Sequence, residues 1–100
     1  MTEFSRINTE QARQLIAERK AVVVDIRDDQ SYANGHMDDS LLLGNHNIAE
    51  FVEQADPDHP VIVVCYHGNS SQGAAQFLCE KGLEEVYSLD GGFEAWRMAK

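Results

Sequence analysis

The cysteines of this sequence, Cys65 and Cys79, carry its most nucleophilic side chains. The thirteen residues between them match neither a zinc knuckle nor a redox pair, so each thiol needs its own explanation. Cys65 stands where an apolar run gives way to a polar loop and then to a helical pattern. Backbone N–H groups in such a loop can converge on one point, and the positive end of the helix dipole reinforces them. Both effects favour the thiolate, so we expect Cys65 to be a catalytic nucleophile.

The loop after Cys65 is expected to bind the substrate, and it consists of Tyr66, His67, Gly68, Asn69, Ser70 and Ser71. Gly68 permits a positive φ or a close approach to a ligand. Ser70 or Ser71 can cap the helix that follows. His67 can add positive charge at low pH, or it can be an exposed residue without a role. The alternative for the whole segment is a buried structural cysteine beside an ordinary turn, because buried cysteines behave as small hydrophobic residues.

Other polar residues are assigned structural roles. Asp25 and Arg27 follow a second apolar run, and such residues form a structural ion pair more often than a substrate site. His36 is expected to hold backbone groups in place rather than to transfer protons. Cys79 lies beside apolar residues of a predicted helix and is expected to pack against the sheet. The four histidines lack the cysteine or carboxylate spacing of a zinc site, so no metal is expected.

These residues are carried by strands that alternate with helices. Short apolar runs predict strands at 21–26, 41–43, 61–65 and 86–89. Helical patterns lie between these runs and around them, and Asn8 with Gln11 and Asn47 with Glu50 can form capping boxes. The alternation indicates an α/β fold with a mainly parallel sheet and helices on both faces. In such sheets ligands bind at the carboxyl ends of the strands, and Cys65 ends the most apolar strand.

Length and composition predict one soluble domain over residues 1–100. Hydrophobic residues make up 43% of the 100 residues, which is enough for a packed core. The formal net charge of −9 argues against nucleic acid or an anionic membrane as a partner. The first five residues lack the basic and apolar regions of a signal peptide, and no segment approaches the roughly 20 apolar residues of a membrane span. These features favour a cytoplasmic location.

Three segments of the sequence resemble signatures of the rhodanese family. The loop from Cys65 to Ser71 resembles the active-site loop of that family, particularly of its single-domain thiosulfate sulfurtransferases. Residues 24–27 and 35–37 are similar to the amino-terminal signature, and residues 90–96 are similar to the carboxy-terminal one. The matches extend from about Ile7 to Arg97, which is nearly the whole chain.

The resemblance implies a rhodanese fold with a five-stranded sheet, and it implies a double displacement. The Cys65 thiolate attacks the outer sulfur of thiosulfate, and the resulting persulfide passes its sulfur to cyanide or to a dithiol acceptor such as a thioredoxin-like protein. No metal or organic cofactor is implied. Many family members carry a basic residue in the loop after the glycine, whereas this sequence has Asn69, Ser70 and Ser71. Backbone amides and hydroxyls must therefore provide most of the anion recognition, and we expect weak affinity for thiosulfate.

Other functions stay open at this point. Cysteine phosphatases and arsenate reductases need an arginine at the end of the loop to clamp an oxyanion, and Ser71 occupies that place. A rhodanese-like module that binds or regulates a partner without catalysis is a further alternative, although such members usually lack the cysteine. The persulfide chemistry is also compatible with another donor, for instance 3-mercaptopyruvate. We expect an enzyme that uses thiosulfate.

Overall fold

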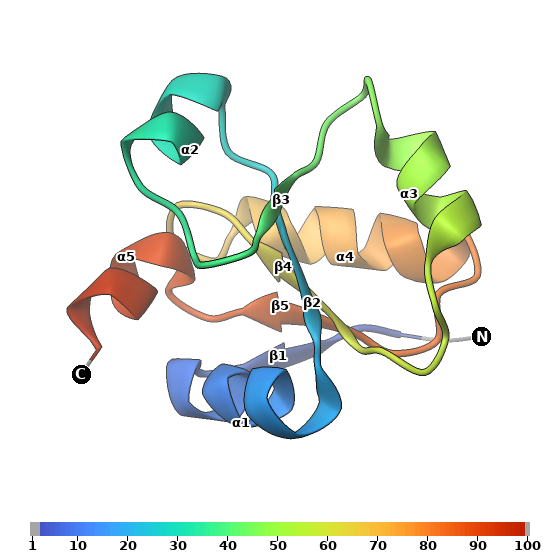
Figure 1. Ribbon diagram of the computed structural model, residues 1–100, viewed down its shortest axis with the longest axis horizontal. Coiled ribbons are helices and arrows are strands. Elements are labelled where there is room, and N and C mark those ends of the chain that lie inside the picture. The colour runs from blue at the N-terminus through green and yellow to red at the C-terminus, as the bar shows by residue number, and fades with distance from the viewer. Residues whose placement is uncertain (1–2, 100) are drawn as a thin grey trace.

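A five-stranded sheet forms the middle layer of the computed structural model, which describes residues 3–99 (Figure 1). The strands are β1 (Ser5–Ile7), β2 (Val22–Asp25), β3 (Leu41–Leu42), β4 (Val61–Val64) and β5 (Val86–Leu89). The helices are α1 (Thr9–Arg19), α2 (Asp29–Asn34), α3 (Ile48–Gln54), α4 (Ser70–Glu80) and α5 (Gly92–Met98). The strand order is β1-β5-β4-β2-β3, and every pairing is parallel. The predicted α/β class, five-stranded sheet and parallel pairing are confirmed.

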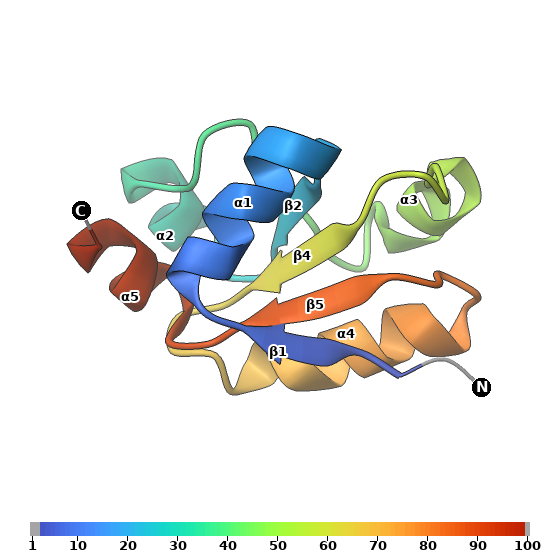
Figure 2. The same cartoon turned by 90° about the horizontal axis from the view of Figure 1, so that it is seen from below.

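Two apolar cores cover the two faces of the sheet. On one face α3 and α4 pack over Val61, Val63 and Val86, and on the other α1 and α5 pack over Ile62 and Val64. Figure 2 shows α1 and α4 on opposite sides of the strands. A strand buried on both faces needs apolar residues at successive positions, because neighbouring side chains point to opposite faces. This is why β4 is an unbroken aliphatic run.

The chain changes its direction across the sheet between β2 and β4. From β2 it moves outward to β3 at one edge, whereas from β4 it moves to β5, towards the opposite edge. Ligand crevices of open α/β sheets form at the carboxyl ends of the strands at such a switch point. Asp25 at the end of β2 pairs with Val64 at the end of β4. The segments that follow these strands, including Arg27 and Cys65, therefore meet at one place.

Some local predictions are confirmed and others are wrong. The capping box of α1 is present, with Asn8 Oδ1 accepting from the Gln11 amide and the Gln11 side chain accepting from the Asn8 amide. The predicted box at Asn47 is absent: its Oδ1 accepts from the Gly44 amide and its Nδ2 donates to the Leu42 carbonyl. Asn47 therefore closes the turn before α3 instead of capping the helix.

Strand β1 is missing from the predicted elements. Its three residues include only one buried side chain, that of Ile7, so no apolar pattern is available. The strand forms because it pairs with β5 at the edge of the sheet. The other strands agree with the predicted ranges to within one residue at each end.

None of the helices within residues 3–99 is long and apolar enough to cross a membrane. Met1 and Thr2, which contribute to the argument against a signal peptide, lie outside the described residues, as does Lys100. The single domain over residues 1–100 stays a prediction.

Candidate active site

Cys65 is the first residue after β4, and its sulfur faces the loop that leads into α4. The residue is buried, with 3% of its surface exposed. Its Sγ accepts hydrogen bonds from the Gly68 amide at 3.1 Å and from the Ser71 amide at 3.3 Å. Donor N–H groups from both the loop and the helix thus converge on one sulfur, as the sequence predicts. Such a convergence stabilises negative charge.

The sulfur takes the place that a capping side chain occupies in most helices. Ser71 is the second residue of α4, so its N–H lacks a partner within the helix. Asn69 stands at the N-cap position, but its side chain makes no capping hydrogen bond. Cys65 Sγ accepts the bond instead and lies at the positive end of the helix dipole. The prediction that Ser70 or Ser71 caps α4 is wrong, because both lie within the helix.

The pKa of the Cys65 thiol is lowered as the net result of opposing effects. Burial raises this pKa, because it penalises the charged thiolate. A hydrogen bond from the Ser71 side chain, with the amides of Ser71, Gly68 and His67, lowers it and outweighs burial. Burial raises the pKa of the Cys79 thiol, which packs in the core between α4 and the sheet, as predicted. The pKa values of the two thiols are therefore shifted in opposite directions, that of Cys65 down and that of Cys79 up.

Gly68 fits its place because of both its φ angle and its lack of a side chain. Its φ of +91° is one that other residues rarely adopt. A Cβ atom there would lie 2.7 Å from the Gly91 nitrogen and 3.1 Å from the Leu89 carbonyl oxygen. Because both neighbours are backbone atoms, a larger residue would displace the loop. The prediction of a positive φ at Gly68 is confirmed.

The start of α5 fixes the other side of the loop. The Phe93 amide donates to the Cys65 carbonyl at 2.8 Å, and the Glu94 amide donates to the Tyr66 carbonyl at 3.2 Å. A Cβ at Gly92 would lie 2.4 Å from the Cys65 carbonyl oxygen, so this approach requires glycine. The C=O and N–H of a trans peptide unit point in opposite directions. Because the Cys65 and Tyr66 carbonyls point towards α5, the N–H groups of the same peptide units, those of Tyr66 and His67, point away from that helix.

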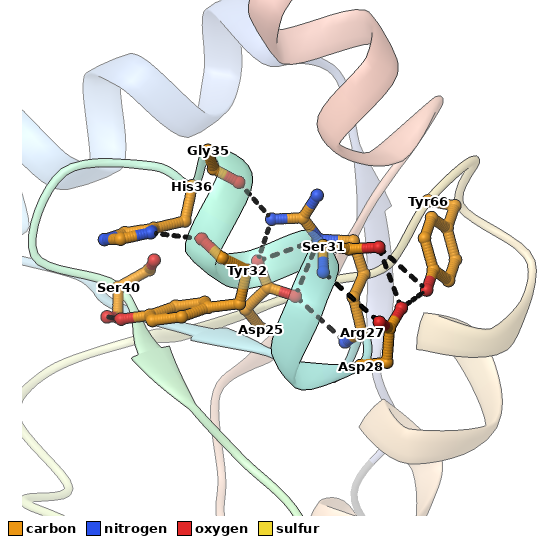
Figure 3. Close-up of polar contacts among 9 residues, drawn as sticks. All are labelled: Asp25, Arg27, Asp28, Ser31, Tyr32, Gly35, His36, Ser40 and Tyr66. Carbon is orange, nitrogen blue, oxygen red and sulfur yellow. Dashed lines mark hydrogen bonds and ion pairs between the residues drawn. The ribbon is translucent and has the colours of Figure 1, made fainter.

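Asp25 and Arg27 form the structural ion pair that the sequence predicts (Figure 3). The Arg27 guanidinium donates to both carboxylate oxygens of Asp25 at 2.7–3.1 Å, and its Nη2 also donates to the Gly35 carbonyl at 2.7 Å. The guanidinium carbon lies 4.3 Å from the centre of the Phe93 ring. The side chains of Arg27 and Asp25 are 5% and 1% exposed. Arg27 thus joins the end of β2 to the end of α2 and to α5.

The side chain of Tyr66 ties the loop to α2 (Figure 3). Its hydroxyl donates to the Asp28 carboxylate and lies 3.2 Å from the Ser31 hydroxyl. Asp28 is the N-cap of α2 and also accepts from the Ser31 amide. These hydrogen bonds, that from Tyr66 first, lower the pKa of Asp28 to about 2. Tyr66 is nevertheless 43% exposed, so its ring forms part of the surface next to Cys65.

His36 holds backbone groups, as predicted (Figure 3). Its Nδ1 lies 2.7 Å from the Tyr32 carbonyl oxygen, and its ring stacks on the Tyr32 ring with centres 3.8 Å apart. The Tyr32 hydroxyl donates to the Ser40 carbonyl. The Ser40 hydroxyl is buried and has no hydrogen-bond partner within the described residues.

The remaining loop residues differ in their relation to the sulfur. Gly68 and Ser71 are buried beside it, whereas His67, Asn69 and Ser70 have exposed side chains. Ser88 of β5 also lies beside the loop, although the sequence did not indicate it: it is fully buried, and its hydroxyl lies 2.7 Å from that of Ser71. A serine within a short apolar strand carries no signal that it faces the site. No group of three or more metal-ligating side chains occurs within residues 3–99.

The fold and this geometry define an α/β protein with a cysteine at the switch point of a parallel sheet, held among backbone N–H groups. A family model described as a rhodanese-like domain matches residues 8–99, and the chain belongs to the rhodanese family.

Relatives named thiosulfate sulfurtransferase GlpE are similar over nearly the whole chain. That of Pseudomonas syringae pv. syringae (strain B728a) is 57% identical, covering 97% of this chain and 91% of its own length. That of Shewanella oneidensis is 52% identical, covering 99% and 98%. The solved structure of a rhodanese-related protein from Thermoplasma volcanium superposes with a TM-score of 0.78 at 26% identity, covering 95% of this chain and 92% of the other. The family resemblance and the rhodanese-like fold are therefore confirmed.

Proposed function

We propose that this protein is a thiosulfate sulfurtransferase in which Cys65 is the nucleophile and residues 66–71 bind the substrate. The observation that carries the proposal is the convergence of the Gly68 and Ser71 amides on Cys65 Sγ, 3.1 and 3.3 Å away. This arrangement favours the thiolate, which is the reactive form. Relatives at 57% and 52% identity bear the name of this activity.

In the first half-reaction the Cys65 thiolate attacks the outer sulfur of thiosulfate. A bond forms between Sγ and that sulfur, the S–S bond of thiosulfate breaks, and sulfite leaves with the electron pair. The product is a persulfide on Cys65, which makes this covalent catalysis with ping-pong kinetics. The N–H groups of the loop stabilise the negative charge, first on the Cys65 thiolate and then on the persulfide.

In the second half-reaction an acceptor attacks the outer sulfur of the persulfide. The bond from Sγ to this sulfur breaks, and its electron pair returns to Cys65 as thiolate. Cyanide accepts the sulfur to give thiocyanate, and we propose a dithiol protein of the thioredoxin-like kind as the acceptor in the cytoplasm. The exposed Tyr66 and His67 side chains provide the surface next to Cys65 that such a protein would contact.

The loop recognises its anionic donor without a fixed cation of its own. No lysine or arginine occurs among residues 66–71. Arg27 is buried near the end of the neighbouring strand, but its guanidinium is engaged with Asp25 and Gly35. Recognition therefore relies on N–H groups and hydroxyls, which supports weak binding of thiosulfate. The missing arginine also disfavours a phosphatase or arsenate reductase, which clamp their oxyanions bidentately.

The test is to incubate the protein with thiosulfate, remove the excess, and measure the mass of the Cys65 peptide. We expect a gain of one sulfur atom on Cys65, and thiocyanate on adding cyanide. The Cys65→Ser variant loses both signals, whereas the matched control Cys79→Ala keeps both, because Cys79 packs in the core. Persulfide on Cys79, or thiocyanate from the Cys65→Ser variant, contradicts the assignment of the nucleophile.

A further inference from the structure

The Tyr66 side chain joins the loop after Cys65 to the start of α2 (Figure 3). Its hydroxyl donates to Asp28 Oδ1, the same oxygen that accepts from the Ser31 hydroxyl at 2.8 Å. The other oxygen of this carboxylate accepts from the Ser31 amide at 3.2 Å. We call the group of Tyr66, Asp28 and Ser31 the clasp. Because two hydrogen bonds from Ser31 already hold the carboxylate, it offers the loop an acceptor in a fixed position.

The clasp is attached to a buried part of the fold. Asp28 directly follows Arg27, whose guanidinium is bound to the Asp25 carboxylate and to the Gly35 carbonyl. The side chains of Arg27 and Asp25 are only 5% and 1% exposed, so the backbone that leads to Asp28 is fixed at the end of β2. The guanidinium carbon also lies 6.0 Å from the centre of the Tyr66 ring. Through Asp28, an exposed residue of the loop is thus tied to a buried ion pair.

Tyr66 fixes the loop just before the turn that brings Gly68 to the sulfur. The Tyr66 carbonyl accepts from the start of α5, and the Gly68 carbonyl accepts from Gln72 Nε2 at 2.9 Å. His67, which lies between them, has an exposed side chain. The Gly68 N–H, which donates to Cys65 Sγ at 3.1 Å, therefore follows the anchored Tyr66 by only two residues. A shift of Tyr66 changes the direction of this donor.

We infer that Tyr66 is a positioning residue, whose hydrogen bond to Asp28 holds the loop in the conformation in which the Gly68 N–H points at the Cys65 sulfur. The Tyr66 hydroxyl gives its proton to Asp28, so it acts on the sulfur through the backbone of the loop. Without this bond the loop samples conformations in which the sulfur loses a donor, and the thiolate is less stabilised. The consequence for turnover rests on the proposed function: persulfide formation slows because a smaller fraction of Cys65 is thiolate.

The test compares two tyrosines that each donate a hydrogen bond to a carboxylate. Tyr66→Phe keeps the ring and removes the bond to Asp28. The matched control, Tyr87→Phe, removes a bond to Glu85 of 2.6 Å that does not involve the loop. The measurement is the pH midpoint for alkylation of Cys65 by iodoacetamide, together with stability in urea. We expect Tyr66→Phe to raise the midpoint by about half a unit, within the range of one hydrogen bond, and Tyr87→Phe to leave it unchanged, although both variants lose stability.

A second change tests whether Tyr66 acts through Asp28. Asp28→Ser retains a residue that can cap α2 but removes the oxygen to which the Tyr66 hydroxyl donates. The lost charge shifts the midpoint by itself, so the comparison is the effect of Tyr66→Phe with and without Asp28. In the Asp28→Ser background we expect this effect to fall by more than half, with the Ser31 hydroxyl, 3.2 Å away, as the remaining partner. A merely structural role of Tyr66 would lower stability without moving the midpoint.

Three results overturn the inference: an unchanged midpoint in Tyr66→Phe, an equal rise in Tyr87→Phe, or an equal rise with and without Asp28. The same variants are then compared in persulfide formation from thiosulfate. Below the midpoint a rise of half a unit leaves about one third of the thiolate, so we expect Tyr66→Phe to react about threefold more slowly. If the midpoints shift as expected while the wild type forms no persulfide with thiosulfate, the proposed function fails and the positioning role of Tyr66 stands.

Discussion

The Gly68 amide reaches the Cys65 sulfur from a backbone with a φ of +91°. In Gly68→Ala the new Cβ would meet the Gly91 nitrogen at 2.7 Å, and the φ itself is strained. We expect the loop to shift and this N–H to leave the sulfur. The loss of a backbone donor from an anion site lowers rates about 10²-fold, and we expect that for persulfide formation from thiosulfate, measured by rapid quench and mass spectrometry.

The matched control for this change is Gly73→Ala. Gly73 lies within α4, and an added Cβ there would meet nothing within 4 Å. Alanine is the better helix former, so we expect this variant to gain about 0.5–1 kcal/mol of stability in urea unfolding and to keep its rate. A Gly68→Ala variant that retains the wild-type rate would show that its amide does not support the chemistry.

The role of a single residue could be predicted from the sequence where its chemical type allows few roles. The place of Cys65 at a strand end before a helix, and the positive φ of Gly68, could be predicted from the sequence, because a thiol and a glycine in such a loop each have few roles. Ser70 and Ser71 could not be distinguished from capping residues, because serine serves equally well as a cap, a donor or a surface group. The place of Ser88 near the site could not be predicted, because its contact with Ser71 forms only when α4 packs on β5.

At the scale of elements, the ion pair between Arg27 and Asp25 holds β2, α2 and α5 in the positions that the site needs. In Arg27→Met the Asp25 carboxylate stays buried without its partner. Breaking a buried pair in this way costs about 3–5 kcal/mol, because the remaining charge is uncompensated. We expect a loss of that size in the free energy of unfolding, measured with urea and circular dichroism.

An exposed ion pair provides the comparison. Arg6 and Asp90 form one with side chains 60% and 40% exposed, and exposed pairs contribute about 0–1 kcal/mol. Arg6→Met should therefore change stability by no more than that amount. A loss in Arg27→Met as small as the loss in Arg6→Met would mean that water or a neighbour compensates the Asp25 charge.

Elements with their own apolar pattern were predictable, and those defined by contact were not. The strands β2 and β4 are buried on both faces, so their sequences alone indicate them. In contrast, β1 is an edge strand with one buried side chain, and its existence depends on β5. The capping box at Asn47 failed for a related reason, since the amide at Gly44 competes for the same side-chain oxygen.

At the scale of the whole molecule, net charge opposes the donor that the site is proposed to use. The chain carries a formal net charge of −9, and thiosulfate is a dianion. The radius of gyration is 12.2 Å, whereas the Debye length is about 30 Å at 10 mM ionic strength and about 8 Å at 150 mM. At low salt the charges of the entire molecule therefore act at Cys65, and at higher salt only those near the loop do.

This difference predicts the sign of the salt dependence. The kcat/KM for thiosulfate should rise about two- to fivefold between 10 and 150 mM sodium chloride, because screening removes long-range repulsion of the dianion. Alkylation of Cys65 by iodoacetamide, which is neutral, should change much less over the same range and serves as the control. A kcat/KM that falls with salt would mean that local positive potential at the amides and the helix end outweighs the net charge even at long range. If kcat/KM for thiosulfate rises with salt while the alkylation rate of Cys65 stays constant, the salt affects the approach of the anion and not the reactivity of the sulfur.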